Sequence, residues 1–376
     1  MKIAFDLRRI KNPGIGRYMK GLAEAVLAQA PEHEYLLVLP QDAADAIAAR
    51  EARVEKVCAT IAYYSLREQV QLPRILRQYG VDVLHSPHFN LPLACPCPLV
   101  VTIHDVIYLA CKQDLPSRIG RMYYRGMMAA AMRRAARVLT DSEFSKRDII
   151  RHLNADPAKI EVVYPGVDPV FRRITDARRI GAVLSRYGIA DDYILYTGIY
   201  KLRKNHAGLL RAFREFLSNG GRAKLVIAGP VDEGAAALRR QAQELGVAEQ
   251  VVLAGFVPEQ DLAALYSAAR VYACPSLYEG FGFTVLEAMA CGIPVVCSAE
   301  TSLSEVAGKA ALYADPRNAQ EFAAAIDRVF RDAELRRDLV DKGAANCLRF
   351  RWENTARNAV AAYRYAAGAC GEAVCA

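Results

Sequence analysis

Two glutamates flank a glycine-containing turn in the segment Tyr278–Glu287, and their spacing would let the two carboxylates bind one ligand at two points. The pattern becomes helical from about Thr284, so the turn would open a helix whose free amides and dipole attract an anion. Glu279 and Glu287 lie too far apart to work as a pair on one helical turn, but they can hold two parts of an elongated ligand. They also fit a structural interpretation, with one carboxylate favoured near the helix start and the other solvated.

A second candidate is a short loop rich in cations that follows the apolar run Tyr193–Thr197. Within it, Arg203 can hold a phosphate with two donors, and Lys204 adds a point charge. Ligands of open parallel sheets bind beyond the carboxyl ends of the strands. The loop therefore favours a phosphate site, with a solvated basic turn as the alternative.

A third candidate follows the first predicted strand, Lys2–Asp6, where Gly14 and Gly16 would let the backbone approach a ligand. The loop lacks the third glycine of a dinucleotide fingerprint, and no acidic residue ends the next strand. The sequence therefore argues against NAD.

His104 ends another predicted strand, where an imidazole can hydrogen-bond a bound ligand. Asp105 is expected either to orient this ring or to lie near the crevice. His85 and His88 end the neighbouring strand and are expected to line the same cleft. A structural histidine is the alternative for each of these positions.

Metal-binding patterns are absent from the sequence. It contains no Asp-x-Asp and no cluster of histidines and carboxylates with ligand spacing. Its ten cysteines lack the paired spacing of a zinc site and are interpreted as reduced thiols. If phosphates bind here, cations and backbone amides must neutralise them, so we predict no metal cofactor.

Short β-branched runs alternate with alanine-rich helical stretches along the chain. Because the runs are apolar on both faces, they predict parallel sheets covered by helices, hence an α/β fold of two doubly wound Rossmann-like domains facing a cleft. The predicted strands of the first half are Lys2–Asp6, Tyr35–Leu39, Val81–His85, Leu99–His104, Arg137–Thr140 and Ile160–Val163. Those of the second half are Tyr193–Thr197, Lys224–Ala228, Gln250–Leu253, Val271–Cys274, Pro294–Cys297 and Ala311–Tyr313.

The domain boundary is expected near residues 164–169, where two prolines and a glycine interrupt regular structure. The expected domains are an N-terminal domain, 1–168, and a C-terminal domain, 169–350. A helix within 351–376 is expected to pack back on the first domain, anchored by the single tryptophan, Trp352, and followed by a tail.

Composition excludes several classes of protein. The 376 residues are 53% hydrophobic and 24% charged, which is ordinary for a soluble protein. No run approaches the ~18 apolar residues of a membrane span, and the acidic residue at position 6 argues against a signal peptide. We therefore expect a cytoplasmic protein. The net charge of +8 favours anionic partners but is too small to require nucleic acid.

Together these segments resemble the retaining glycosyltransferases of family 4, which have the GT-B fold, and the bacterial mannosyltransferases of surface polysaccharide assembly among them. The resemblance covers most of the chain. It rests on Gly14–Arg17, Thr140–Ser145, Tyr164–Asp168, Arg203–Asn205, and Glu279–Glu287 followed by Ala288–Val296. It implies a transferase that moves a hexose from a nucleotide-diphosphate sugar to a glycan or lipid-linked acceptor, as in lipopolysaccharide synthesis. GDP-mannose and UDP-sugars both fit as the donor.

The resemblance also implies roles for donor-binding residues. Glu287 would bind the ribose hydroxyls, Glu279 the transferred hexose, and Lys204 the diphosphate. The backbone amides that would bind the sugar and the diphosphate belong to Phe281, Gly282, Phe283 and Thr284.

Other roles implied by the resemblance fall in the first domain and the cation loop. The loop of Gly14 and Gly16 would close over the diphosphate, and His104 would contact the hexose and help position the acceptor. Ile199 stands where many relatives carry an arginine. We favour Arg203 as its replacement because it lies beside the lysine of the same loop, with Lys201 and Arg17 as alternatives.

The acceptor is the part of the reaction about which the sequence indicates least. The basic amphipathic stretch Ser117–Arg137 fits peripheral contact with the anionic cytoplasmic face of the inner membrane, and a solvated helix face fits equally well.

Two other functions are alternatives to the transferase. A sugar-nucleotide epimerase on a similar scaffold would use His104 and Glu279 as acid and base. A non-catalytic scaffold would be expected to lose the cations or the first glutamate, which this chain keeps.

Overall fold

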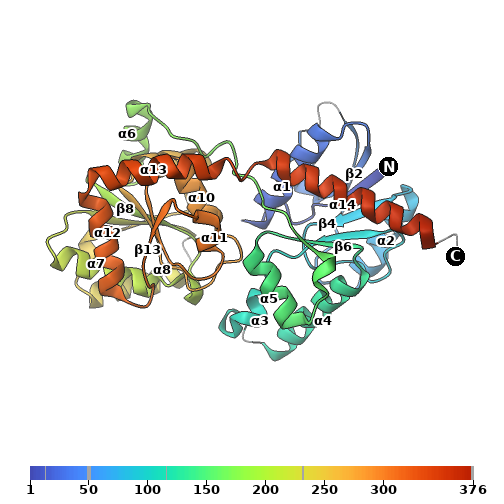
Figure 1. Ribbon diagram of the computed structural model, residues 1–376, viewed down its shortest axis with the longest axis horizontal. Helices are drawn as coiled ribbons and strands as arrows, with labels where there is room; N and C mark the ends of the chain where they lie inside the picture. The colour runs from blue at the N-terminus through green and yellow to red at the C-terminus, as the bar shows by residue number, and fades with distance from the viewer. Residues whose placement is uncertain (13, 49–51, 116, 231–232, 374–376) are drawn as a thin grey trace. The chain divides into compact units, whose positions relative to one another are not determined.

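The computed structural model describes residues 1–12, 14–48, 52–115, 117–230 and 233–373, and it divides the chain into two compact units (Figure 1). Unit 1 comprises Met1–Gly166 and Phe350–Ala376, and unit 2 comprises Val167–Arg349. The chain therefore passes from unit 1 to unit 2 and returns to unit 1 for its last helix. Within the described ranges, no helix combines the length and apolar character needed to span a membrane.

Unit 1 is built on a seven-stranded parallel sheet with the strand order β3-β2-β1-β4-β5-β6-β7. Its strands are β1 (Lys2–Asp6), β2 (Glu34–Leu39), β3 (Arg53–Cys58), β4 (Val83–Ser86), β5 (Leu99–Thr102), β6 (Arg137–Thr140) and β7 (Ile160–Val162). Its α-helices are α1 (Ile15–Gln29), α2 (Glu68–Gln78), α3 (Ile107–Ala110), α4 (Arg118–Arg134), α5 (Glu143–Leu153) and α14 (Trp352–Ala373). Short 3₁₀ turns are η1 (Gln41–Ala43), η2 (Lys112–Asp114) and η3 (Pro157–Lys159).

Unit 2 repeats the plan with a six-stranded parallel sheet in the order β10-β9-β8-β11-β12-β13. Its strands are β8 (Tyr193–Thr197), β9 (Lys224–Ala228), β10 (Val251–Gly255), β11 (Val271–Cys274), β12 (Val295–Cys297) and β13 (Ala311–Tyr313). Its α-helices are α6 (Ala177–Arg186), α7 (His206–Ser218), α8 (Glu233–Glu244), α9 (Glu259–Ala268), α10 (Phe283–Ala290), α11 (Leu303–Ala307), α12 (Ala319–Arg331) and α13 (Ala333–Cys347). Two 3₁₀ turns complete it, η4 (Leu202–Lys204) and η5 (Ala248–Gln250).

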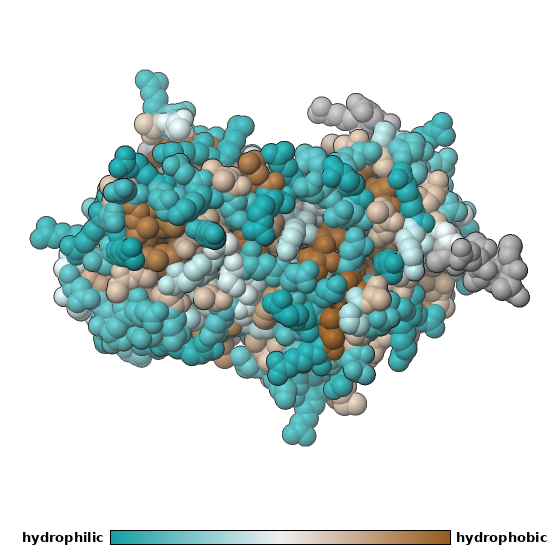
Figure 2. Space-filling model, in the orientation of Figure 1, coloured by the Kyte–Doolittle hydropathy of each residue, from teal (hydrophilic) through white to brown (hydrophobic). Residues whose placement is uncertain are grey.

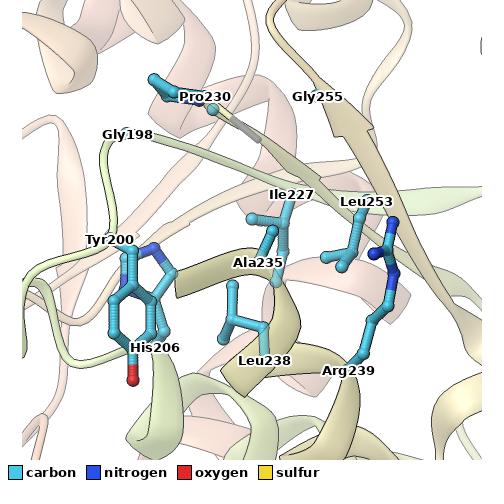
Figure 3. Close-up of a pocket in the computed structure, with 11 residues that line it drawn as sticks. Gly198, Tyr200, His206, Ile227, Pro230, Ala235, Leu238, Arg239, Leu253 and Gly255 are labelled. Carbon is cyan, nitrogen blue, oxygen red and sulfur yellow. The ribbon is translucent and has the colours of Figure 1, made fainter. Parts of the chain in front are cut away.

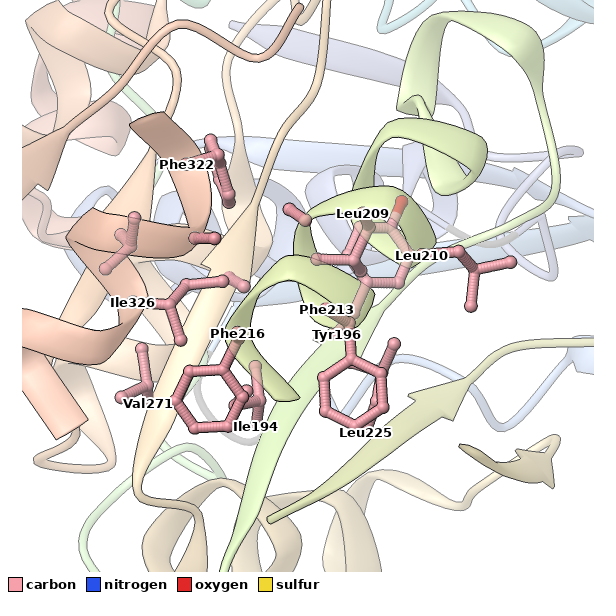
Figure 4. Packing of buried hydrophobic residues seen from close by; sticks show 14 of the residues in the cluster. Ile194, Tyr196, Leu209, Leu210, Phe213, Phe216, Leu225, Val271, Phe322 and Ile326 are labelled. Atoms are coloured by element: carbon pink, nitrogen blue, oxygen red, sulfur yellow. The ribbon is translucent and has the colours of Figure 1, made fainter. Parts of the chain in front are cut away.

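One hydrophobic cluster joins α7 and α12 to the sheet of unit 2 (Figure 4). Phe213 and Phe216 of α7 are fully buried and pack with Phe322 and Ile326 of α12 over Ile194 of β8. Burying such rings removes apolar surface from water, at roughly 25 cal/mol for each Å². The cluster fixes the start of α7, and with it the cation loop that precedes this helix.

Both sheets share one topological feature that locates a ligand site. The strand order reverses between β1 and β4 in unit 1 and between β8 and β11 in unit 2. At such a point the loops that follow the two strands turn to opposite faces of the sheet, which leaves a crevice at the carboxyl ends. All four loops include residues that the sequence singled out.

The prediction of two doubly wound α/β domains is confirmed, and twelve of the thirteen strands match predicted runs to within two residues at each end. The missed strand is β3, an edge strand in which charged residues stand on both faces, Arg53 and Glu55 on one and Lys56 on the other. It lacks the two apolar faces that identified the others. Helix α1 begins at Ile15, directly after Gly14.

The last helix, α14, lies along α1 (Figure 1), with Trp352 at its start. The indole ring fills the space beside two glycines: a Cβ on Gly21 would lie 2.3 Å from the ring, and one on Gly166 would lie 2.5 Å from it. Tyr18 of α1 meets the same ring edge-on at 6.0 Å. The tryptophan therefore joins the last helix to the first helix of unit 1 and to the end of its first segment.

Two mid-helix glycines in unit 1 should respond to alanine with opposite signs. Gly21→Ala should lower the free energy of unfolding by about 1–3 kcal/mol, because the new methyl group collides with Trp352. Gly126→Ala, in α4, meets no atom within 4 Å and should raise that free energy by up to about 1 kcal/mol. Urea unfolding of the two variants measures both effects, and equal shifts would contradict the packing described here.

Candidate functional site

In unit 2 the cation loop and the glutamate loop meet at the switch point. Lys204 ends η4 after β8, and Glu279 lies in the loop after β11. The ammonium group of Lys204, Nζ, donates to Glu279 Oε1 at 2.6 Å. The lysine side chain is only 14% exposed and the glutamate side chain only 10%. Sequence reasoning placed both residues at a ligand site without predicting that they would pair with each other.

Backbone contacts hold the two loops together. The Leu277 N–H donates to the Arg203 carbonyl at 2.7 Å. Asn205 has the left-handed conformation (φ 55°), and its side-chain amide donates to the carbonyls of Pro275 at 3.2 Å and Pro316 at 2.7 Å. Asparagine tolerates this conformation better than most residues, which is the signal in the sequence that could have identified this residue. Arg203 is half-buried in the same turn.

The glutamate loop is fixed where it enters α10. The Ser302 hydroxyl lies 2.8 Å from the carbonyl oxygen of Glu279 and 2.9 Å from that of Phe281. Gly282 precedes the helix with φ 100°, a conformation that favours glycine. Phe283 is the first residue of the helix, and Thr284 the second. The four predicted amide donors therefore sit at the start of α10.

Glu287 lies within α10 and is 3% exposed. Its carboxylate accepts a hydrogen bond from the Tyr266 hydroxyl at 3.1 Å, and that hydroxyl also contacts Thr197 Oγ1 at 2.7 Å. Burial and the nearby carboxylate raise the pKa of Tyr266 well above its ordinary value, so the phenol keeps its proton and can donate it. The two glutamates are therefore held by different partners at two ends of one short segment.

A small cavity lies beside the ends of β8, β9 and β10 (Figure 3). Gly198, Gly229 and Gly255 line it together with the imidazole of His206 and the side chain of Leu238 from α8. Its volume is about 20 Å³, which suits about one water molecule. It is too small for a nucleotide base as it stands.

In unit 1 the partner of His104 is Asp141. Of the two roles expected for Asp105, the orientation of this ring is therefore wrong. His104 Nδ1 lies 2.7 Å from Asp141 Oδ2, and Nε2 lies 3.2 Å from the Pro87 carbonyl. Asp105 instead accepts the Ile107 N–H at 2.9 Å. The register explains the pairing, since β5 and β6 align Thr102 with Leu139, and two residues further on this brings 104 opposite 141.

The charge of His104 follows from these contacts. Burial alone lowers the pKa of the imidazole, but the Asp141 carboxylate more than offsets it, and the pKa is raised above its ordinary 6.5. Both ring nitrogens face acceptors, so the protonated ring donates twice. Tyr18 contacts the ring edge-on at 4.7 Å.

His85 does not line a cleft, contrary to expectation. It is fully buried between the Tyr363 hydroxyl, at 2.7 Å, and Thr102 Oγ1, at 2.9 Å. Burial lowers its pKa to about 3, so it stays neutral and links α14 to the sheet. His88 is also largely buried, and its Nε2 lies 2.6 Å from Arg9 Nη1.

The two glycines before α1 differ in their surroundings. Gly14 has φ 78°, and a Cβ there would meet no atom within 4 Å, so its backbone can be approached. A Cβ on Gly16 would lie 2.0 Å from the Ile10 carbonyl oxygen. Close packing within the loop therefore requires glycine at position 16, whatever ligand binds.

The part of the chain that the structure describes contains no group of three or more histidines, cysteines or carboxylates that could hold a metal ion. The absence of a metal cofactor stays a prediction, which activity measurements must test.

Two family models match the chain. The model described as Glycosyltransferase Family 4 matches residues 13–171, and the one described as Glycosyl transferases group 1 matches residues 188–345. Of the described strands, all but β1 lie within these two matches.

Similarity to individual proteins agrees with the two family models. The chain is 34% identical to the O-antigen chain mannosyltransferase B of Escherichia coli, over 97% of this chain and all of that one. It is 29% identical to the serotype-specific mannosyltransferase WbdA of Escherichia coli, over 73% of this chain and 35% of that one. The crystal structure of Anabaena Alr3699/HepE in complex with UDP and glucose has a TM-score of 0.75 and 20% identity, and the match covers 96% of this chain and 98% of that one. This last likeness shows the GT-B fold.

The His104–Asp141 contact predicts a pH dependence of stability. Because the pKa of His104 is raised on folding, the contact stabilises the protein fully below about pH 6.5 and is lost as the pH rises through the folded pKa. Asp141→Asn should cost about 1.5–3 kcal/mol at pH 6 and less at pH 9. Urea unfolding across this range measures the difference.

The matched control is Asp156→Asn, at an exposed cap of η3 that asparagine also fills. It should show no such dependence. A cost for Asp141→Asn that stays constant from pH 6 to pH 9 would contradict a charged His104.

Proposed function

Because this chain belongs to the family 4 glycosyltransferases, we propose that it is a retaining, metal-independent enzyme that transfers mannose from a nucleotide-diphosphate sugar to a growing glycan. The observation that carries the proposal is the Lys204–Glu279 contact at the switch point of unit 2. A cation and a carboxylate, both nearly buried, lie beside the start of a helix whose amides suit a diphosphate.

The proposed chemistry is the handling of charge on the leaving group. As the bond between the sugar and the diphosphate breaks, negative charge grows on the diphosphate oxygen. Lys204, Arg203 and the amides at the start of α10 would stabilise that charge, and a group that acts mainly in the transition state raises turnover. The acceptor hydroxyl forms the new bond on the same face, and its proton passes to the departing phosphate oxygen.

The remaining donor contacts are assigned on the same basis. Glu287 would accept hydrogen bonds from the ribose hydroxyls, and Glu279 from the hexose. On the acceptor side, His104 and the loop of Gly14 and Gly16 complete the proposed set. The likeness to the O-antigen chain mannosyltransferase supports mannose as the transferred sugar and a glycan or lipid-linked glycan as the acceptor. The mannose donor that we propose is GDP-mannose.

The alternative of a sugar-nucleotide epimerase receives no support from the matching families and relatives.

The exposed face of α4 supports a peripheral contact with an anionic membrane. Ile119 and Met122 are 81% and 75% exposed, with Arg118 and Arg125 exposed beside them. Such residues contrast with the mostly hydrophilic surface drawn in Figure 2. We propose that they rest on lipid headgroups on the cytoplasmic side, where a lipid-linked acceptor would be presented.

The wild type should sediment with vesicles containing phosphatidylglycerol, whereas Met122→Glu should stay in the supernatant. Equal binding of the two proteins would contradict the contact.

The donor site predicts a paired result with nucleotide sugars. GDP-mannose at 100 times its dissociation constant should stabilise the protein by about 2.7 kcal/mol, seen as a rise in Tm. Lys204→Ala should lower turnover by about 10²–10³-fold, because the growing charge of the diphosphate loses its cation. Lys342→Ala, an exposed lysine of α13 in the same unit, should keep full turnover.

The outcomes test the identity of the donor and the role of Lys204 separately. A shift with UDP-sugars alone would replace the donor but keep the transferase. Full turnover of Lys204→Ala would mean that another cation holds the diphosphate.

Metal independence predicts that turnover survives excess EDTA. The loop cations and the amides of α10 would supply the positive charge that a metal supplies elsewhere. Release of the nucleoside diphosphate with and without EDTA is the measurement. Loss of turnover that added Mg²⁺ or Mn²⁺ alone restores would overturn this part of the proposal.

A further inference from the structure

A buried ionic cluster in unit 1 takes no part in the donor contacts proposed above. Arg8 lies beyond the end of β1 and donates to Asp6 through Nε and Nη2, both at 2.7 Å, and to Glu68 Oε1 at 2.6 Å. All three side chains are at most 2% exposed. Removing charges from water is costly, so a cluster of this kind is weak support for stability and calls for another reason.

The cluster fixes the loop that follows β3. Glu68 Oε2 accepts the Tyr64 N–H at 3.0 Å and the Asn90 side-chain amide at 2.7 Å. Tyr64 has φ 63°, a strained conformation for a bulky residue, and strain of this kind tends to occur at functional sites. Asn90 in turn accepts the Tyr123 hydroxyl at 3.0 Å. One buried carboxylate thus sets the positions of two tyrosines.

These tyrosines are held rigidly yet face solvent. Tyr64 is 47% exposed and Tyr123 is 43% exposed, and their rings meet edge-on at 5.8 Å. Phe89 stacks behind Tyr64 at 6.2 Å. Arg9 Nη1 donates to the Tyr64 hydroxyl at 2.7 Å, so a cation lies at the rim. The two rings, with Arg9, are called the tyrosine platform below.

We propose that the tyrosine platform binds a pyranose ring of the acceptor glycan, an inference that rests on the proposed function. One face of a pyranose presents polarised C–H groups, which suit the negative face of an aromatic ring, while its rim of hydroxyls suits Arg9 and the phenol oxygens. The rings are already ordered, so binding loses little side-chain entropy. The platform also lies beyond the carboxyl ends of the parallel strands, where such sheets bind ligands.

A sugar accounts for these features better than a lipid does. A lipid contact needs exposed apolar surface, which α4 already offers, and it gains nothing from rings anchored through buried hydrogen bonds. The polar backing, the strained backbone and the cation at the rim all match a ligand with one apolar face and a polar edge.

The test uses the full chain with α-linked mannotriose as the probe. Saturation-transfer NMR with irradiation of aromatic protons should give strong signals for the wild type. Tyr64→Ala should lose most of this signal and raise the KM for mannotriose at least tenfold. Tyr123→Phe keeps the ring and the fold but loses the Asn90 contact, and should raise the KM about threefold. Tyr365→Ala is the matched control: this tyrosine is 49% exposed in the same unit, packs on Arg137 at the start of β6, and should change neither readout.

Each outcome decides the proposal. An unchanged signal and KM in both Tyr64→Ala and Tyr123→Phe overturn it, as does a Tyr64→Ala variant that keeps the mannotriose signal but loses binding to phosphatidylglycerol vesicles. GDP-mannose binding is followed in the same samples. If the wild type binds mannotriose at the platform but no nucleotide sugar, the proposed function fails while the sugar subsite stands.

Discussion

The parallel arrangement of the strands is the constraint on which the chemistry of this protein depends. Within each sheet every strand runs in the same direction, so the loops that follow the strands emerge at one edge of that sheet. The reversal of strand order between β8 and β11 then brings Lys204 and Glu279 within 2.6 Å although they are 75 residues apart. In unit 1 the edge that carries His104 and Asp141 also carries Arg8, Tyr64 and Asn90. Loops of quite different composition can occupy these positions because the sheets, not the loops, determine where they meet.

Much of this could be predicted from the sequence because the strands are apolar on both faces and punctuated by glycine and proline. Runs such as Tyr193–Thr197 have no other stable place than the centre of a covered sheet. The edge strand β3 was not predicted because charged residues stand on both of its faces. This omission matters because Tyr64 of the tyrosine platform lies in the loop that follows β3.

The partners of the site residues could not be predicted in the same way. Asp105, next to His104 in the chain, was one candidate partner, whereas the actual partner, Asp141, follows the neighbouring strand. Only the pairing of β5 with β6 brings Asp141 opposite the imidazole. The Lys204–Glu279 pair likewise depends on strand order, which local sequence does not reveal. Gly16 illustrates a different limit, because a ligand loop and a closely packed loop both require glycine and look identical in sequence.

The pairing of Lys204 with Glu279 also bears on what the proposed donor must supply. Separating two nearly buried charges leaves each of them without a partner. Removing one member of such a pair costs about 3–5 kcal/mol. A free phosphate would satisfy Lys204 but repel Glu279. A sugar diphosphate carries an anion for the lysine and hydroxyl donors for the glutamate, so it can replace both contacts at once. On the proposed function, the ion pair therefore favours an intact nucleotide sugar over its hydrolysed product, and the pair forms again once the nucleoside diphosphate has also left.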